Sequence, residues 1–372
     1  MLQDNDLAKW VYKKHTRVKH ALLEKYLLAW MPILGSRYPW VTYFDGFAGR
    51  GVYEDGSPGS PVLAMQLADK LAPRLQRVTL RFVERNPENY ENLRAAVETE
   101  LSRLTYPEKV SVHHTQGDFD EAACAFLDQA EARGASQAPS FFFIDPFGFT
   151  GVPLETVGRI LSVPKTEVFF TFMLRDINRF LELGQLVDQM NVLFGGGCWR
   201  DVVSHADRER ALVELYRRQL HEQANATYSL HFKVCESDST ATLYYLIHAN
   251  NNFKGHQIMK GVMLNQGVNG EFAYLGKNDL SERTQMLLFD PNDTSALAGE
   301  LLRRFAGQTL TFDGIMEAMC HPWNLEPPFI ERHYRQVIKS MASDGSLCIR
   351  RVSSKRSGLK ENDLVVFASQ RS

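Results

Sequence analysis

The chain has 372 residues, of which 44% are hydrophobic, and its formal net charge is -2 at pH 7. This composition is typical of a globular protein with one large and one smaller domain, and it argues against a chain that coats nucleic acid with uniform positive charge. A polar N-terminus and the lack of a long apolar run predict a cytoplasmic protein that binds no membrane. The five cysteines are scattered without metal-ligand spacing, so we expect reduced, mostly buried thiols and no metal.

Hydrophobic periodicity predicts an α/β domain over residues 1–289. An amphipathic helix over 20–34 precedes a buried strand over 40–45. The elements expected next are helices over 61–72, 86–101, 120–132 and 153–162, which alternate with strands over 78–84, 109–115, 140–145 and 166–173. Nearly continuous apolar strands that alternate with helices are typical of a doubly wound parallel sheet.

The alternation is lost over residues 174–235, for which we expect a helical insertion. Two further strands, over 242–249 and 271–276, are expected to flank a helix over 253–264 and to complete the sheet.

A polar segment over 290–295 marks the expected boundary of a second domain, over 296–372. Three helical patterns there precede two strand patterns joined by a basic turn. This order is typical of a winged helix.

A glycine-rich segment, DGFAGRG over residues 45–51, follows the first strand, where doubly wound sheets bind their ligands. Small residues would let a ligand lie against the backbone, with freed amides to bond to it. A tight turn before a helix is the alternative interpretation. Three further features favour a ligand. Glu84 ends the second strand, where a carboxylate typically accepts ribose hydroxyls, Asp118 follows the third strand, and Asp145 ends the fourth.

The order of residues in this segment separates two classes of protein. A dinucleotide dehydrogenase has G-x-G-x-x-G directly after the strand, whereas here Asp45 comes first and the order is D-G-x-x-G-x-G. This order, with the later G-D and D-P-F-G, resembles the class I S-adenosylmethionine-dependent methyltransferases, whose fold is a Rossmann-like doubly wound sheet.

A longer match covers nearly the whole chain. The segments KHALLEKYLLAW, YFDGFAGRGVYEDGSPGSP, FVERNP, FFFIDPFGFTGVP, LFGGGCW and YYLIHANNNFKGHQIMK resemble the three-Cys-motif partner protein (TcmP) family, with its winged-helix-type C-terminal extension. The family is named for cysteines of a neighbouring protein. The resemblance implies such a protein as partner and S-adenosylmethionine as cofactor.

The resemblance also implies roles for the residues at the strand ends. Glu84 would hold the ribose and Asp118 the adenine, while Asp45 orients the amino-acid end of the cofactor. The residues expected around that end are Asp45, Gly46, Phe47, Ala48, Gly49 and Gly51. The alternatives are an exposed Glu84 paired with Arg85 or a lysine, and an Asp118 that only caps the following helix.

Asp145, Pro146 and Phe147 are the candidate catalytic residues. In amino-methylating nucleic-acid enzymes this place carries D-P-P-Y or D-P-P-F, in which the acid and a backbone carbonyl bind the amine and the ring stacks on the base. Here Phe147 replaces the second proline and Gly148 the ring, so Phe147 or Phe149 is left to stack, and methylation of an amine is in doubt. A turn without chemistry is the alternative. No cysteine follows a proline near this strand, which disfavours the covalent route to cytosine C5.

Two basic segments predict contact with nucleic acid. One is the N-terminal run Lys13, Lys14, His15, Arg17, Lys19 and His20, expected near the mouth of the crevice or else on a solvated helix face. The other is the turn of the second domain, with Arg350, Arg351, Lys355 and Arg356. Docking of a protein on that domain is the alternative.

The sequence therefore predicts an S-adenosylmethionine-dependent methyltransferase that acts on a nucleic acid or nucleotide. The second hypothesis is a non-catalytic Rossmann-like adaptor or nucleotide-binding protein that works with the cysteine-motif partner. His113, His114 and His248 have no metal-spaced acidic neighbours in the sequence and are expected to be structural.

Overall fold

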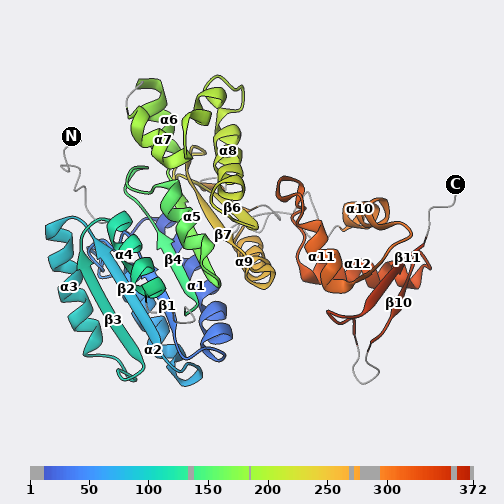
Figure 1. Ribbon diagram of the computed structural model, residues 1–372, viewed down its shortest axis with the longest axis horizontal. Helices are drawn as coiled ribbons and strands as arrows, with labels where there is room; N and C mark the ends of the chain where they lie inside the picture. The colour runs from blue at the N-terminus through green and yellow to red at the C-terminus, as the bar shows by residue number, and fades with distance from the viewer. Residues whose placement is uncertain are drawn as a thin grey trace. The chain divides into compact units, whose positions relative to one another are not determined.

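The computed structural model describes residues 12–132, 138–183, 186–267, 272–276, 294–352 and 358–368. The chain divides into two compact units (Figure 1), and the described residues up to 276 belong to the first and those from 294 to the second. The limits 1–289 and 296–372 stay a prediction, since the expected boundary lies mostly outside the described residues. No helix in the described part of the chain has both the length and the apolar character that a membrane crossing requires.

Eight strands among the described residues of the first unit form one sheet, in the order β3-β2-β1-β4-β5-β7-β6-β8. The strands are β1 (Val41–Asp45), β2 (Val78–Glu84), β3 (Val110–Gln116), β4 (Ser140–Ile144), β5 (Thr166–Phe172), β6 (Tyr228–Cys235), β7 (Thr242–Asn250) and β8 (Ala273–Tyr274). Neighbours from β3 to β5 pair in parallel, whereas β7 runs antiparallel to both β5 and β6. The predicted doubly wound α/β sheet is confirmed.

Helices cover both faces of this sheet because successive side chains of its buried strands point to opposite faces. Tyr43 and Phe143 pack into a core under α1 (Lys14–Gly35), α2 (Ser60–Leu71), α3 (Pro87–Leu101) and α9 (Phe253–Gln266). Phe44 and Phe142 pack into the opposite core. The elements on that side are α4 (Phe119–Ala132), α5 (Leu154–Ser162), α6 (Leu174–Leu183), α7 (Val187–Phe194), α8 (Arg208–Glu222) and the 3₁₀ turn Gly197–Val202. A further 3₁₀ turn, Ala72–Arg74, follows α2.

Two predicted elements of the first unit need correction. The stretch 174–235 is not entirely helical, because its last eight residues form β6 inside the sheet. The strand was missed although Leu230, Phe232 and Val234 are buried and alternate with more polar positions, which is the period-2 pattern of a strand. The first helix also begins at Lys14 rather than at residue 20, so most of the basic N-terminal run belongs to α1.

The second unit packs three helices against a small antiparallel sheet with the order β10-β11-β9. Its elements are α10 (Ser295–Phe305), β9 (Thr309–Thr311), α11 (Phe312–Met319), the 3₁₀ turn Trp323–Leu325, α12 (Glu331–Ser343), β10 (Leu347–Arg350) and β11 (Leu364–Phe367). Buried Phe305, Ile315 and Val365 belong to its core. The sequence predicted the helices and the last two strands but missed the three-residue β9.

A buried carboxylate fastens α1 to the sheet. Glu167 on β5 is 5% exposed and accepts hydrogen bonds from the Tyr26 hydroxyl and from Trp30 Nε1 (3.2 Å). It also lies 2.9 Å from Nε2 of His248 on β7. A buried carboxylate is stable only when its oxygens are hydrogen-bonded or paired, so these contacts hold α1, β5 and β7 in one arrangement.

We expect Glu167→Ala to lower the free energy of unfolding by about 3 kcal/mol or more, because it leaves the Tyr26 hydroxyl, the Trp30 N–H and His248 buried without their acceptor. Urea denaturation followed by tryptophan fluorescence measures the change. The matched control is Glu155→Ala on the exposed side of α5, for which we expect a change within about 0.5 kcal/mol. A loss at Glu167 no larger than that of the control would contradict the anchoring role.

Candidate functional site

The strand order reverses between β1 and β4, which run in parallel at the centre of the sheet. In open α/β sheets the ligand crevice lies outside the carboxyl ends of the strands at such a point. Three predicted carboxylates come to this edge: Asp45 ends β1, Glu84 ends the neighbouring β2, and Asp145 follows β4. The structure therefore brings together residues that lie far apart in the sequence.

Asp45 is completely buried at the base of the crevice. Its Oδ1 accepts a hydrogen bond from the Phe47 amide (3.2 Å), and its Oδ2 from the Tyr43 hydroxyl (3.4 Å). Burial raises the pKa of Asp45 to about 7, although the Ser60 hydroxyl and the Phe47 amide act in the opposite direction. Asp45 therefore gains or loses a proton near neutral pH.

The sequence predicted free amides in the glycine-rich segment. In its first part, residues 46–49, the segment does not offer them. The amides of Gly46 and Ala48 donate to the carbonyl oxygens of Phe143 and Val83, both at 2.9 Å. The Gly49 amide donates to Oε2 of Glu84 at 2.8 Å, and the Phe47 amide is bonded to Asp45. Four successive amides are thus bonded to protein acceptors, mostly from the neighbouring strands β2 and β4.

Packing and backbone geometry account for two of the glycines. A Cβ at Gly46 would lie 2.3 Å from a ring carbon of Phe119, and this distance is too short for any real Cβ contact. Gly51 has a φ of +80°, and a Cβ there would lie 2.9 Å from that of Ala96. The tight-turn interpretation explains these residues without a ligand.

Glu84 is buried rather than exposed, so the alternative of an exposed, ion-paired carboxylate is wrong. The residue is 8% exposed, and its Oε1 and Oε2 accept from the amides of Asn86 (2.7 Å) and Gly49 (2.8 Å). Burial raises its pKa. Each carboxylate oxygen has a second lone pair, so Glu84 keeps acceptor capacity for two hydroxyls.

Asp118 lies at the outer part of the crevice, after β3. Its side chain is 53% exposed and its Oδ1 lies 3.5 Å from Nη1 of Arg85. Its carbonyl oxygen accepts from the Ala122 amide (3.1 Å), so the residue stands directly before α4. This position is compatible with both a capping role and a contact to a ligand.

Asp145 forms an ion pair with Lys19 of α1. The Lys19 ammonium donates to Oδ2, and the side chains of Lys19 and Asp145 are only 11% and 22% exposed. The Lys19 ammonium also lies 5.6 Å from the centre of the Tyr244 ring. The basic N-terminal run therefore reaches the mouth of the crevice as predicted, and Lys19 and His20 are buried rather than on a solvated face.

The two phenylalanines after Asp145 differ in exposure. Phe147 is 75% exposed, whereas Phe149 is 2% exposed and packs on Phe180 with ring centres 5.4 Å apart. Phe147 is thus the one of these two rings that a ligand can reach. Pro146 between Asp145 and Phe147 is buried.

Sequence reasoning missed Lys19 as the partner of Asp145, and it missed the aromatic residues Tyr12, Tyr53 and Tyr244 around this pair. One signal was present. Lys19 precedes Leu23 and Tyr26 at helical spacing on the buried stripe of α1, where a lysine needs a buried partner.

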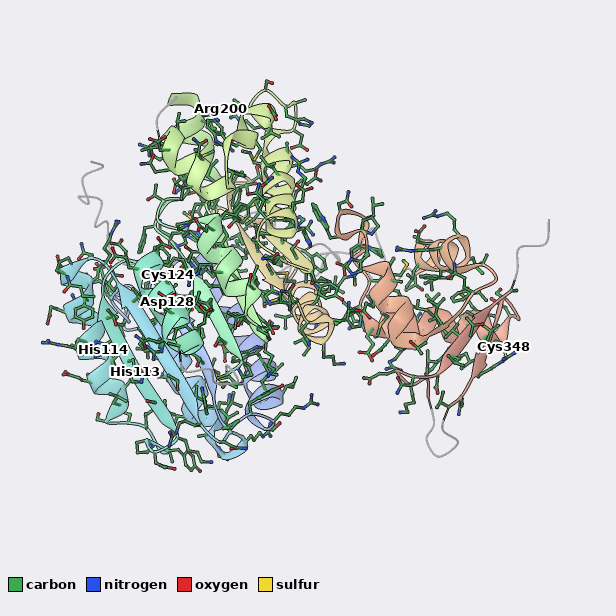
Figure 2. All side chains as sticks on the ribbon, in the orientation of Figure 1. His113, His114, Cys124, Asp128, Arg200 and Cys348 are labelled. Carbon is green, nitrogen blue, oxygen red and sulfur yellow. The ribbon has the colours of Figure 1, made fainter. Side chains whose placement is uncertain are left out.

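The other predicted residues belong to different elements of the fold. His113 and His114 lie on the edge strand β3 (Figure 2), and His248 is bonded to Glu167. None of the five cysteines forms a disulfide, but the expected burial holds only for Cys235 and Cys320. Arg350 and Arg351 are exposed at the end of β10, whereas Lys355 and Arg356 lie outside the described residues.

No protein-family model matches the chain, and no curated protein matches it. Among solved structures, the chain is similar to an O-methyltransferase from Bacillus cereus in complex with S-adenosylhomocysteine, with 15% identity, a TM-score of 0.31, and coverage of 62% of this chain and 80% of that one. It is similar to the O-methyltransferase TomG from Streptomyces achromogenes in complex with S-adenosylmethionine, with 13% identity, a TM-score of 0.31 and the same coverage. It is also similar to Trm1 from Pyrococcus horikoshii with S-adenosylmethionine, with 13% identity, a TM-score of 0.32, and coverage of 65% and 58%.

Identities and TM-scores this low do not transfer an activity to this chain. The sheet itself is the predicted Rossmann-like doubly wound sheet, with β7 antiparallel beside β5.

The raised pKa of Asp45 predicts a pH-dependent stability. The folded state binds the proton more tightly than the unfolded state, so the stabilisation is full below about pH 4 and is lost as the pH rises through about 7. This group should lower the free energy of unfolding by about 2 kcal/mol between pH 5.5 and pH 8. Urea denaturation at the two pH values measures this change, and Asp45→Asn should abolish it. Asp188→Asn, at an exposed aspartate, should leave it in place, and an unchanged pH dependence in Asp45→Asn would refute the assignment.

Proposed function

We propose that this chain is an S-adenosylmethionine-dependent methyltransferase that acts on a nucleic acid or nucleotide. The observation that carries the proposal is the chemistry of the crevice at the strand-order reversal. Three carboxylates, Asp45, Glu84 and Asp145, stand at the strand ends, and the adjoining amides 46–49 are already bonded to protein acceptors.

This chemistry suits S-adenosylmethionine better than a dinucleotide. A dinucleotide brings a pyrophosphate, which needs free amides at a glycine-rich turn and gains no donor from the carboxylates at these strand ends. S-adenosylmethionine carries no phosphate, its sulfonium and ammonium groups are positive, and its single carboxylate leaves it with a net positive charge. The engagement of the loop amides, which corrects the sequence prediction, therefore favours the methyl donor.

The roles that we propose for the cofactor-binding residues are those that the sequence predicted. Glu84 would accept the ribose hydroxyls with its remaining lone pairs, and Asp118 would bind the adenine amine. Asp45 would orient the amino-acid end. The residues that would surround that end, by shape rather than by donated amides, are Gly46, Phe47, Ala48, Gly49 and Gly51.

Asp145 would align the methyl acceptor. When bound, the cofactor supplies an electrophilic methyl group, and the protein's task is to hold the acceptor in line with it. Because Oδ2 of Asp145 accepts from Lys19, Oδ1 is left to accept a proton donor of the substrate. The Pro146 carbonyl would offer a second acceptor, and the exposed Phe147 ring a stacking surface.

The second unit would be a winged helix, since its order α10-β9-α11-α12-β10-β11 places two antiparallel strands after three helices. Arg350, Arg351, Lys355 and Arg356 would bind phosphates from the segment that joins these strands. The domains would span 1–289 and 296–372. A three-Cys-motif protein would be the partner, as the sequence resemblance implies.

A specific observation also favours the non-catalytic adaptor. The amides of residues 46–49 and Oδ2 of Asp145 have partners inside the chain, so this part of the crevice is hydrogen-bonded without a ligand. Cofactor binding and turnover distinguish the two functions.

Calorimetric titration with S-adenosylmethionine and S-adenosylhomocysteine is the first test. We expect micromolar binding to the wild type, and binding at least tenfold weaker in Glu84→Gln, which loses a charged acceptor for the ribose hydroxyls. Glu91→Gln, at an exposed glutamate of α3, is the matched control and should bind as the wild type does. Absence of wild-type binding to both compounds would reject the methyltransferase in favour of the adaptor.

Methyl transfer from tritiated S-adenosylmethionine to DNA and RNA pools, with and without the partner, tests Asp145. We expect Asp145→Ala and Asp145→Asn to lose at least 100-fold in turnover while they retain cofactor binding, since the residue aligns the acceptor and not the donor. Asp188→Asn should keep full activity. Equal transfer by the Asp145 variants and the wild type would remove Asp145 from the mechanism.

A further inference from the structure

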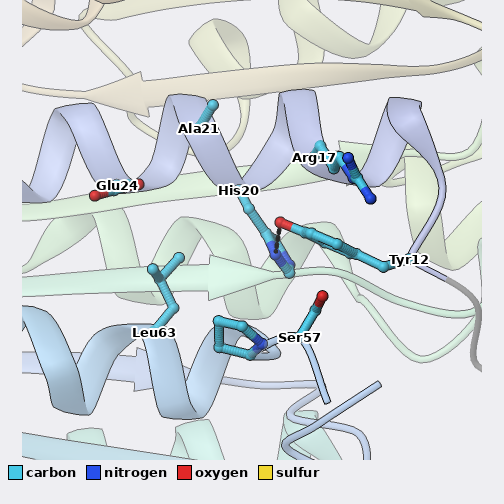
Figure 3. A pocket seen from close by; sticks show the side chains of 8 residues that line it. Tyr12, Arg17, His20, Ala21, Glu24, Ser57 and Leu63 are labelled. Carbon is cyan, nitrogen blue, oxygen red and sulfur yellow. Dashed lines mark hydrogen bonds between the residues drawn. The ribbon is translucent and has the colours of Figure 1, made fainter. Parts of the chain in front are cut away.

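A cavity lies between α1 and the segment around the start of α2. Its volume is about 470 Å³, which is within the range of small-molecule sites. Tyr12, Arg17, His20 and Glu24 form one side, and the segment 57–63 forms the other. Figure 3 shows Tyr12 and His20 facing Ser57 and Leu63 across this space.

An aromatic cluster supports the wall of the cavity. The Tyr12 ring packs on Tyr53 with centres 4.9 Å apart, and the His20 ring lies 5.4 Å from Tyr12 and 5.9 Å from Tyr53. Tyr53 thus backs the Tyr12 ring, which lines the cavity. A supported ring of this kind is a stacking platform, and stacking on it is tolerant of the identity of the base.

His20 adds hydrogen-bonding capacity to the cavity. Burial, and then the positive charge of Lys19, lowers the pKa of His20 to about 3, so the imidazole is neutral at pH 7. One ring nitrogen, Nδ1, lies 3.2 Å from the Tyr12 hydroxyl. Because Nδ1 is paired with Tyr12, Nε2 of the neutral ring is left as one donor or one acceptor for the edge of a nucleobase.

The cavity adjoins the crevice rather than a remote surface. Lys19 and His20 are consecutive in α1, and the first binds Asp145 while the second lines the cavity. After burial, the charge of Asp145 is the largest contribution that raises the pKa of Tyr53. The aromatic cluster and the candidate catalytic carboxylate therefore lie within electrostatic reach of each other.

Exposed cations lie on one side of the cavity. Lys13, Lys14 and Arg17 are exposed at the start of α1, and the Arg17 guanidinium lies 5.1 Å from the centre of the Tyr12 ring. Among the described residues, no carboxylate lies within ion-pair distance of these three cations. Asp55 and Glu24 act on this region only at longer range. Exposed cations next to a stacking ring are the combination that single-stranded nucleic acids require.

We propose that this cavity is the acceptor subsite and holds one unpaired nucleobase of a single-stranded nucleic acid, stacked on Tyr12, with Lys13, Lys14 and Arg17 on the flanking phosphates. The proposal rests on the function proposed above and adds where the substrate would bind. The base edge would face His20 and the Lys19–Asp145 pair. DNA and RNA share this chemistry and form separate arms of the test.

The test uses the full chain and 12-nucleotide single-stranded DNA and RNA that carry one 5-iodouracil. Irradiation followed by peptide mass spectrometry maps the crosslink, and fluorescence anisotropy measures the affinity. We expect a crosslink at Tyr12 and about tenfold weaker binding by Tyr12→Ala, whereas Tyr12→Phe keeps the ring and should bind as the wild type does. The local crosslink reports on this cavity whatever the second unit adds to the affinity.

Tyr38→Ala is the matched control, because Tyr38 follows the opposite end of α1, and it should change neither the crosslink nor the affinity. Crosslinks that map only outside residues 12–24 and 53–63, or unchanged affinity of Tyr12→Ala, would overturn the proposal. Titration of the same samples with S-adenosylhomocysteine tests the proposed methyltransferase function separately from the proposed subsite. Cofactor binding without a crosslink rejects the subsite alone, and a crosslink without cofactor binding rejects the methyltransferase while the nucleobase site stands.

Discussion

The hydrogen bonds of Glu167 to α1 are the interaction on which the arrangement of the site depends. Tyr26 and Trp30 bind this carboxylate from one face of the helix, which fixes the rotation of α1 about its axis. Lys19 precedes Tyr26 by seven residues, or about two turns and 10.5 Å, and so lies on the same face. The anchor therefore directs Lys19 to Asp145. His20, about 100° further round the helix, is turned into the neighbouring cavity.

Three carboxylates in one crevice would repel each other in the absence of compensation, and each is stabilised in a different way. Burial keeps Asp45 close to half protonated at neutral pH, whereas backbone amides of the adjoining segments hold Glu84. Asp145 is neutralised by Lys19. Asp145 is also partly exposed, whereas Asp45 and Glu84 are buried. A ligand can therefore form a hydrogen bond with Asp145 more easily than it can replace the contacts of Asp45 or Glu84.

The parts of the fold that the sequence predicted are those with a strong local signal. Strands such as 140–144 are continuous apolar runs, and Asp45, Glu84 and Asp145 were placed at one edge because parallel strands end together. What the sequence could not show depends on partners far along the chain. The loop amides find acceptors on β2 and β4, and the burial of Lys19 depends on Asp145 and on the anchor at Glu167. Strand β6 was missed although its alternation was visible, since it follows a long helical stretch.

The cations at the start of α1 change from exposed to buried along the chain. Lys13, Lys14 and Arg17 are exposed, whereas two residues further on Lys19 is buried and already neutralises Asp145. A phosphate is attracted to the exposed cations but gains nothing deeper in the crevice, where Glu84 and the ionised fraction of Asp45 add negative charge. A neutral base edge meets the opposite situation, because His20 and the free lone pairs of Asp145 offer it hydrogen bonds. The same helix would thus hold the backbone of a nucleic acid outside and admit only the base.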